Sequence, residues 1–382
     1  MDLELSEEEA ELRDNVRSVL SGVCPPSVVR AVYENKGEPA AVWDKMVELY
    51  WPAMGIAEDL GGLGMGFVQL AIVAEELGRA TVPSPFLATV TQFAPAVREL
   101  GSDEQHRQFL SKVAAGELTG TLAIAEQSSW RLDHDEAIAT KSADGWTLTG
   151  TKHAVLDGAT ADEVVVIARS AGSSGADGLG AFVVAGSSLE ATAGAVMDPT
   201  MPMADVALDG VTVSADRVLA EPGAAGVALA LQRAVEEAAV AMAMMTAGAC
   251  RKIFDDTLEY AKQREQYDRL IGSFQAIKHR FADMYLSVER ASALCYFAAL
   301  TIAEEDGRRA EAAALAKAAA GECQRLLVRE GLQLHGGIGY TWEHDLHFLL
   351  KRAKTGDLMF GNAASHRAHL AELLGLTGGR AA

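Results

Sequence analysis

Two short stretches in the C-terminal third of the chain combine residue types that suit a phosphorylated ligand. The first reads Arg264-Glu-Gln266-Tyr267, and Gln275 follows it after Ile-Gly-Ser-Phe. In a chain with 33 Lys and Arg against 53 Asp and Glu, and a net charge of −20, the cations from Arg264 to Arg280 are a local basic exception. A diphosphate needs fixed donors, and a guanidinium group supplies a rigid fork of them. A simpler interpretation of Arg264 is a cation that complements the end of a helix dipole.

The second stretch reads Gln333-Leu-His335-Gly336-Gly337-Ile-Gly339. Three glycines within four positions allow positive φ angles and a close approach of the backbone to a ligand. Because the stretch follows a predicted helix rather than a strand, it is no dinucleotide-binding fingerprint of the Rossmann type. A plain helix C-cap explains the two adjacent glycines equally well. For His335 we expect packing or hydrogen bonding rather than catalysis.

The elements that must position these residues differ along the chain. Apolar residues at helical spacing and a capping box at Ser6 and Glu9 predict a helical N-terminal domain over 1–118. Short β-branched segments at 145–152, 163–169 and 181–185, separated by Gly, Ser and Asp, predict a middle antiparallel β domain over 119–222. Long helices at about 228–265, from about 274, and at 308–332 predict a helical C-terminal domain over 223–382. The predicted fold class is therefore α+β.

The composition argues against several classes of function for this protein. The strong negative charge argues against a general nucleic-acid binder and against a polybasic membrane-surface protein. Four cysteines (Cys24, Cys250, Cys295 and Cys323) without paired spacing argue against a disulfide framework or a structural zinc site. His344 and His347 flank Asp345, but no further ligand spacing supports a metal site. The acidic N-terminus and the shortness of the most apolar run lead us to expect a cytoplasmic protein.

Together these stretches make the chain similar to the acyl-CoA dehydrogenase family along essentially its whole length. The matching segments are Glu58-Asp-Leu-Gly-Gly-Leu-Gly64, Glu75-Glu-Leu-Gly-Arg79, Leu208-Asp-Gly-Val-Thr-Val, and the Arg264 and Gln333 stretches. The resemblance implies that the C-terminal domain is a four-helix bundle. It also implies FAD as cofactor and oxidation of an acyl-CoA to the 2,3-enoyl-CoA. In such proteins one subunit holds the flavin ring and supplies the base, while a neighbour reaches across with the Arg and Gly-Gly motifs.

In this chain the residues that would bind a neighbour's FAD match the family pattern, whereas the residues at the base positions do not. The residues implied to bind a neighbour's FAD are present: Arg264, Gln266, Tyr267, Gln275, Gln333, Gly336 and Gly337. The family's usual base position is occupied by Phe360, before Gly361, and the alternative base position by Ala238. Neither side chain can accept a proton. Glu237 is one residue away, and a shift of one residue turns a helical side chain by about 100°.

The flavin-ring side departs from the family pattern as well. The family's Thr-Glu-Pro-x-x-Gly-Ser-Asp loop corresponds to 125–132, where Ala125 lacks the hydroxyl and Arg131 replaces a small Ser. The Trp-Ile-Thr segment that packs on the ring corresponds to 154–156, beginning at Ala154. On the neighbour-facing side, the hydroxyl and amide at the end of the base motif are replaced by Asn362 and Ala364.

This one-sided pattern resembles the base-lacking subunit of bacterial α2β2 heterotetrameric acyl-CoA dehydrogenases, several of which act on sterol side-chain CoA thioesters. We therefore expect a subunit that completes a homologous partner's FAD site. One alternative is a self-sufficient homo-oligomeric dehydrogenase with a displaced acid such as Glu237. Others are a non-catalytic scaffold of the same fold and, more remotely, a flavin monooxygenase or oxidase.

Overall fold

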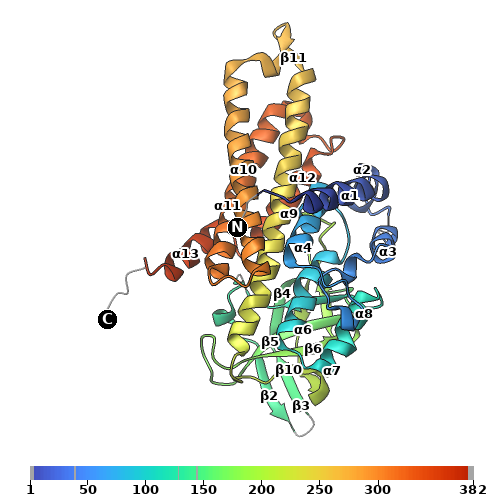
Figure 1. Cartoon of the computed structure of the whole chain (residues 1–382), viewed down its shortest axis with the longest axis vertical. Coiled ribbons are helices and arrows are strands. Elements are labelled where there is room, and N and C mark those ends of the chain that lie inside the picture. Colours follow the sequence, from blue (N-terminus) through green and yellow to red (C-terminus); the bar gives the residue numbers. More distant parts are fainter. Residues whose placement is uncertain (1–3, 38–39, 128, 143–144, 377–382) are drawn as a thin grey trace. The chain divides into compact units, whose positions relative to one another are not determined.

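The computed structural model describes residues 4–37, 40–127, 129–142 and 145–376. Helices precede and follow a central run of strands, which confirms the predicted order (Figure 1). The first helix is α1 (Glu7–Val23), and the last before the strands is α8 (Ser111–Ala114). Strands β1 (Gly120–Ala123) to β10 (Val218–Ala220) follow, and α9 (Val227–Gln263) opens the C-terminal helices.

By packing, the chain divides into two compact units. The first comprises Met1–Gly37, Phe67–Val82 and Ala239–Ala382, and the second comprises Glu38–Gly66 and Pro83–Ala238. The boundaries predicted at 118 and 222 follow secondary structure instead, and that three-domain division stays a prediction.

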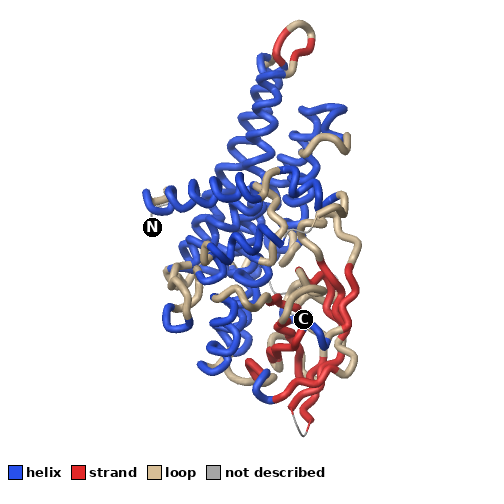
Figure 2. Tube along the Cα trace, turned by 90° about the vertical axis from the view of Figure 1, so that its right-hand side faces the viewer, coloured by secondary structure: helices blue, strands red, loops and turns tan. Residues whose placement is uncertain are grey.

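The first unit is built mainly from helices around one apolar core. Three long helices, α9, α10 and α11, lie side by side in both views (Figures 1 and 2), as predicted for the C-terminal bundle. Of these, α10 spans Gln275–Ala303 and α11 spans Arg309–His335. Besides α1, the unit also contains α2 (Pro26–Tyr33), α4 (Phe67–Arg79), α12 (Leu346–Leu358) and α13 (Ala363–Leu373). Cys250, Met284 and Leu327, one from each long helix, are completely buried in this core. All four cysteines are free thiols and are buried.

Local sequence explains where α1 begins and why α9 lies in the core. At α1 the Ser6 hydroxyl accepts from the Glu9 N–H at 3.2 Å and the Glu9 carboxylate accepts from the Ser6 N–H at 2.8 Å, which confirms the predicted capping box. α9 is apolar and buried on every face from Ala238 to Cys250, which is typical of a core helix. By length and composition α10 could cross a membrane, but core helices share these properties, and 44% of its most apolar window is buried.

The second unit contains two sheets flanked by short helices. The larger sheet has the order β10-β6-β5-β2-β3-β9, with β1 paired to β5, and the smaller has the order β4-β8-β7. The remaining strands are β2 (Ile138–Ser142), β3 (Gly145–Thr149), β4 (Thr151–Leu156), β5 (Glu163–Ser170), β6 (Leu179–Ala185), β7 (Glu190–Ala193), β8 (Met203–Ala207) and β9 (Val211–Ser214). The helices are α3 (Ala40–Glu48), α5 (Phe86–Ala88), α6 (Ala94–Leu100), α7 (Asp103–Gln105) and α8, with a π-helical turn at Thr89–Phe93.

Two details of the β region differ from the sequence prediction. The sheets are not purely antiparallel, because β5 pairs in parallel with β1 and with β2. The unbroken apolar run of β5, buried from Val164 to Ala168, is typical of a central strand with parallel neighbours. The strand predicted over 145–152 is split at Gly150, whose φ of +147° lets the chain leave one sheet for the other.

Candidate functional site

Arg264 lies directly after α9, where the chain enters an exposed hairpin of β11 (Glu265–Gln266) and β12 (Arg269–Leu270) (Figures 1 and 2). Tyr267 and Asp268 form its turn with φ angles of 56° and 57°, the left-handed pair that a two-residue hairpin favours. The Tyr267 side chain is 88% exposed at the tip. Within the described ranges, no side-chain hydrogen bond or ion pair engages Arg264, so its donors can bind an external anion.

The glycine stretch forms the turn between α11 and the next segment. Gly336 has φ of 63° and ψ of −141°, a combination that residues with a Cβ rarely adopt. A Cβ added at Gly336 or at Gly337 would meet no heavy atom within 4 Å. Gln333, on the last turn of α11, is exposed. The backbone of this turn is therefore open to a ligand at close range.

His335 joins the two motifs within the first unit. Its ring stacks on Tyr260 of α9 with centroids 4.5 Å apart, and its Nδ1 lies 2.8 Å from the Gly331 carbonyl. Tyr260 is one helical turn before Arg264, whose N–H donates to the Tyr260 carbonyl at 2.9 Å. Burial lowers the pKa of His335, which agrees with the expected packing role. The Arg and Gly-Gly motifs are thus held at the same end of the α9–α11 pair.

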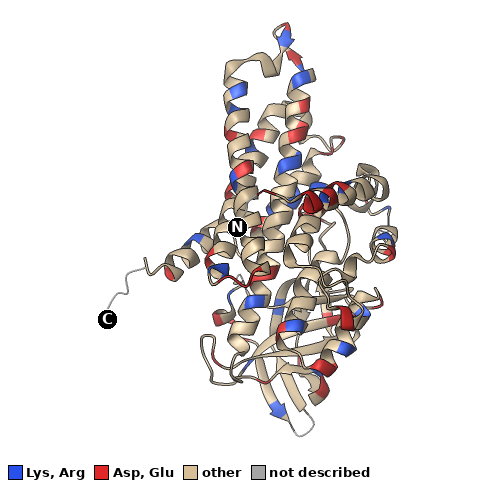
Figure 3. Cartoon of the chain, viewed as in Figure 1, with Lys and Arg blue, Asp and Glu red and all other residues tan. Residues whose placement is uncertain are grey.

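These features fit the diphosphate of FAD, the cofactor that the resemblance implies. Arg264 offers a guanidinium, and Gln266, Gln275 and Gln333 offer exposed amides. At Gly337 the space that a Cβ would occupy is open, so a ligand can approach the backbone there. The Gly336 N–H itself is used within the chain, because it donates to the carbonyls of Leu332 and Gln333 at the end of α11. Figure 3 shows Lys and Arg interspersed with Asp and Glu along α9 and α10 up to the hairpin.

The usual base position holds a buried apolar side chain. Phe360 is 4% exposed and has φ of +56°, which a bulky residue seldom adopts. The turn that carries it is fixed from two sides. The Lys317 Nζ donates to the carbonyls of Gly356 and Met359 at 2.7 and 2.6 Å, and the His366 Nε2 lies 2.8 Å from the Phe360 carbonyl. The turn is therefore well supported, and the Phe360 side chain itself cannot accept a proton.

The alternative base position on α9 also lacks a proton acceptor. Ala238 is completely buried, and Glu237 beside it is 3% exposed. The Glu237 carboxylate accepts from the Arg98 guanidinium at 2.5 Å, within the second unit. Burial opposes the charge of Arg98, but Glu237 and Glu99 outweigh this and raise its pKa. Glu237 is thus engaged in an ion pair that links α9 to α6.

The loop that corresponds to the family's flavin-ring loop is fastened from within the second unit. The Lys152 ammonium, completely buried, forms ion pairs with Glu126 and, at 2.5 Å, with Asp135. The Glu126 carboxylate also accepts from the N–H groups of Glu136 and Ala137 at 2.7 and 2.9 Å. Burial raises the pKa of Asp135 to about 7. These contacts brace the loop but provide no hydroxyl in place of the one missing at Ala125, which is itself buried.

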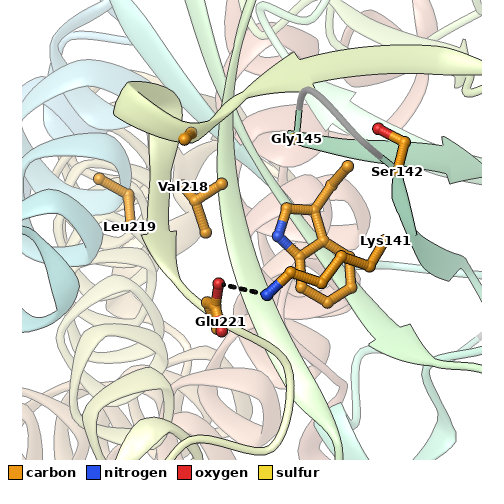
Figure 4. A pocket seen from close by; sticks show the side chains of 8 residues that line it. Lys141, Ser142, Gly145, Val218, Leu219 and Glu221 are labelled. Carbon is orange, nitrogen blue, oxygen red and sulfur yellow. Dashed lines mark hydrogen bonds and ion pairs between the residues drawn. The ribbon is translucent and has the colours of Figure 1, made fainter.

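No group of three or more His, Cys, Asp or Glu side chains that could hold a metal ion occurs within the described residues. A hollow of about 540 Å³ lies at β2, β3 and β10 (Figure 4). Its Lys141 pairs with Glu221 at 3.1 Å and lies 5.5 Å from the Trp146 ring centre. None of the predicted site residues lines this hollow.

Comparison with known proteins identifies the family. Residues 6–117 match the family model described as acyl-CoA dehydrogenase, N-terminal domain, and residues 224–375 match acyl-CoA dehydrogenase, C-terminal domain. The chain belongs to the acyl-CoA dehydrogenase family and has its fold. It is 32% identical over 349 residues to acyl-CoA dehydrogenase IpdE2 of Mycobacterium tuberculosis (strain ATCC 25618 / H37Rv), covering 91% of each chain.

Two solved structures of heteromeric relatives superpose on nearly the whole chain. A chain of the ChsE4–ChsE5 complex from Mycobacterium tuberculosis is 26% identical, with a TM-score of 0.88 and coverage of 99% of this chain and 100% of that one. A variant of the Tcur3481–Tcur3483 steroid ACAD is 27% identical, with a TM-score of 0.84 and coverage of 97% and 98%. The resemblance to sterol-type heteromeric subunits is therefore confirmed, whereas the roles of individual residues stay predictions.

Sequence reasoning missed three residues that support the candidate site. Lys317, Lys152 and Arg98 hold the Phe360 turn, the 125–137 loop and Glu237, respectively. A lysine within an apolar helix run, as at Lys317, is a signal that could have pointed to a buried cation. Lys152 and Arg98 stand among ordinary surface-like residues and carry no such signal.

Proposed function

We propose that this chain is a subunit of an FAD-dependent acyl-CoA dehydrogenase that forms a 2,3-enoyl-CoA. In this proposal it completes the FAD site of a homologous partner subunit and does not supply the catalytic base. The observation that carries the proposal is a contrast between two sets of residues. Arg264, Gly336 and Gly337 are exposed or open to a ligand, whereas Phe360 and Ala238 put apolar side chains at both base positions.

The chain's own residues would bind and orient the cofactor. Arg264 would donate charge-assisted hydrogen bonds to the diphosphate, and the Gln266 and Gln333 amides would donate to neighbouring polar groups. The open turn at Gly336 and Gly337 would let the backbone at Gly337 approach the cofactor closely. When bound, FAD supplies the hydride acceptor of the family's reaction. The carboxylate that acts as the base and removes the α-proton of the acyl-CoA would come from the partner.

Two observations favour the heteromeric form over a self-sufficient enzyme. Glu237, the only acid next to the alternative base position besides Glu236, is held by Arg98 at 2.5 Å. The solved relatives include the ChsE4–ChsE5 complex and the Tcur3481–Tcur3483 pair, which contain two different chains by their descriptions. We propose a partner of the same kind, and an acyl-CoA of the sterol side-chain class as the first substrate to test.

The decisive experiment compares the chain alone with the chain co-expressed with a homologous subunit from the same genome. We expect FAD and dehydrogenation of acyl-CoAs, followed with ferrocenium as electron acceptor, only in the complex. In that complex Arg264→Ala should weaken FAD binding about 10- to 100-fold, since a hydrogen bond to a charged group contributes about 1.5–3 kcal/mol.

Lys262→Ala is the matched control for the Arg264 variant. It removes a cation two residues earlier, which is exposed and pairs with Glu259 at 2.6 Å. This control should leave FAD binding unchanged. Stoichiometric FAD together with turnover by the chain alone would overturn the proposal and favour a displaced base. A stable complex without FAD or activity would favour the scaffold.

A further inference from the structure

The segment that follows the Gly-Gly turn is fastened to the N-terminal helix α2. The Arg30 guanidinium donates through Nη1 to the Trp342 carbonyl at 2.9 Å and through Nη2 to the Glu343 carbonyl at 3.1 Å. It also forms an ion pair with Asp345 and lies 5.1 Å from the centre of the Phe348 ring. One side chain thus binds two backbone groups, a carboxylate and a ring of the same short segment.

Aromatic packing from the same helix reinforces this anchor. Tyr33, one turn after Arg30, contacts the rings of Trp342 and Phe348 with centroid distances of 6.3 and 4.4 Å. The Lys351 ammonium lies over both Tyr33 and Trp342, at 4.7 and 5.2 Å from their ring centres. Tyr33 is 8% exposed, so the cluster buries part of α2 against the segment.

The Gly-Gly turn therefore lies between two fixed points. On one side His335 is held by Tyr260 and by the Gly331 carbonyl. On the other side Trp342 is held by Arg30. The six residues between His335 and Trp342 include three glycines, which have a large conformational entropy to lose on ordering. Because both ends are held, part of this conformational entropy is already lost before a ligand binds. Ordering the turn therefore takes less of the binding free energy.

We propose that Arg30 is a positioning residue for the cofactor turn, through which α2 sets the orientation of Gly336 and Gly337. The proposal rests on the function proposed above for this turn and adds the requirement for an N-terminal residue. A planar fork is needed because the two carbonyls and the carboxylate are bound at once, and lysine has no such geometry. Asp345 and Glu34, which pair with Arg30, and Lys351 and His347 beside Tyr33 complete the charged surroundings.

The test uses the heteromeric complex and three variants: Arg30→Ala, Arg30→Lys and the control Arg13→Ala. Arg13 is a cation of α1 that forms an ion pair with its neighbour Asp14 at 3.0 Å. We expect Arg30→Ala to weaken FAD binding about ten-fold, and Arg30→Lys about three-fold, because loss of preorganisation reduces affinity. Turnover at saturating FAD should stay within two-fold of the unchanged complex. Hydrogen exchange should accelerate at 336–345.

The outcomes separate this proposal from the one on which it rests. Unchanged FAD affinity in Arg30→Lys and Arg30→Ala, with weakened binding in Arg264→Ala, would overturn the role of Arg30 alone. Unchanged affinity in Arg30→Ala, Arg30→Lys and Arg264→Ala would instead overturn the proposed cofactor site. If Arg30→Ala does not fold, Arg30→Lys decides, because it keeps the charge and the apolar stem. Faster exchange spread over the whole unit, rather than at 336–345, would also contradict a positioning role.

Discussion

The Lys317 ammonium lies 2.6 Å from the carbonyl oxygen of Met359, the residue directly before Phe360. Its other acceptors are the carbonyls of Gly356 and Asp357, at 2.7 and 3.2 Å. The last carbonyls of a helix have no partners within the helix, so Lys317 caps the end of α12 from the interior. A 1% exposed lysine therefore supports the turn to which the resemblance assigns the base.

This relationship predicts a pH-dependent contribution to stability. Burial lowers the pKa of Lys317 to about 7, although the Asp357 carboxylate opposes the shift. An unfolded lysine titrates near 10.4, so between about pH 7 and pH 10 the unfolded state binds more protons. The free energy of unfolding contributed by Lys317 should therefore rise with pH in this window. Urea unfolding of the unchanged chain and of Lys317→Met at pH 7, 8 and 9 should show a growing difference, and parallel profiles would contradict this.

A second prediction concerns Glu237. In the complex, Glu237→Gln should keep turnover within about three-fold, whereas loss of a general base would cost about 10²–10⁴-fold. The same change should lower the free energy of unfolding by about 1–3 kcal/mol, because the Arg98 guanidinium loses a charged partner. Glu236→Gln, on the adjacent position, is the control for both measurements. A large loss of turnover in Glu237→Gln alone would restore the displaced-base alternative.

A third prediction uses the two adjacent glycines as a matched pair. Gly336→Ala forces a Cβ onto a backbone with φ of 63° and should cost about 1–3 kcal/mol of stability. Gly337→Ala meets no neighbouring atom and no positive φ, so stability should change by less than about 1 kcal/mol. If this turn binds FAD, Gly337→Ala should still weaken FAD binding. Unimpaired binding in that variant would argue against close approach of the cofactor.

A fourth prediction concerns the buried ion pairs of the second unit. Lys152→Met leaves Glu126 and Asp135 without their shared cation and should destabilise the chain by about 3–5 kcal/mol. Lys141→Met removes an exposed ion pair with Glu221 and should cost only about 0–1 kcal/mol. Thermal unfolding followed by circular dichroism distinguishes the two, and equal losses would contradict the bracing role of Lys152.

The fold was largely predictable because its signals are local. The long apolar run of α9 and the Gly-rich breaks between strands depend on neighbouring residues, so 228–265 and 163–169 were predicted close to their observed bounds. The parallel pairing of β5 with β1 was not predictable, because it joins Gly120 to Glu163 through tertiary structure. The turn of the β11–β12 hairpin was not predictable either, because Tyr267 and Asp268 take positive φ angles in the absence of a glycine.

The candidate site was predictable only in its composition. Arg264 and Gly336 stand out by residue type, but the stacking of Tyr260 on His335 joins residues 75 apart in sequence, and no local pattern shows it. The pairing of Arg98 with Glu237 spans 139 residues in the same way. Such contacts determine whether a carboxylate is available for chemistry, so the state of Glu237 required the structure.

The buried cysteines allow the rate at which the long helices open to be measured. Cys250, Cys295 and Cys323 lie one each on α9, α10 and α11, and all three are completely buried. Burial also raises the pKa of Cys250 and Cys295, which keeps their thiols protonated. An alkylating reagent can therefore reach them only when the long helices separate. Mass spectrometry of the alkylated chain would then time the opening of each helix with native reporters, without an introduced label.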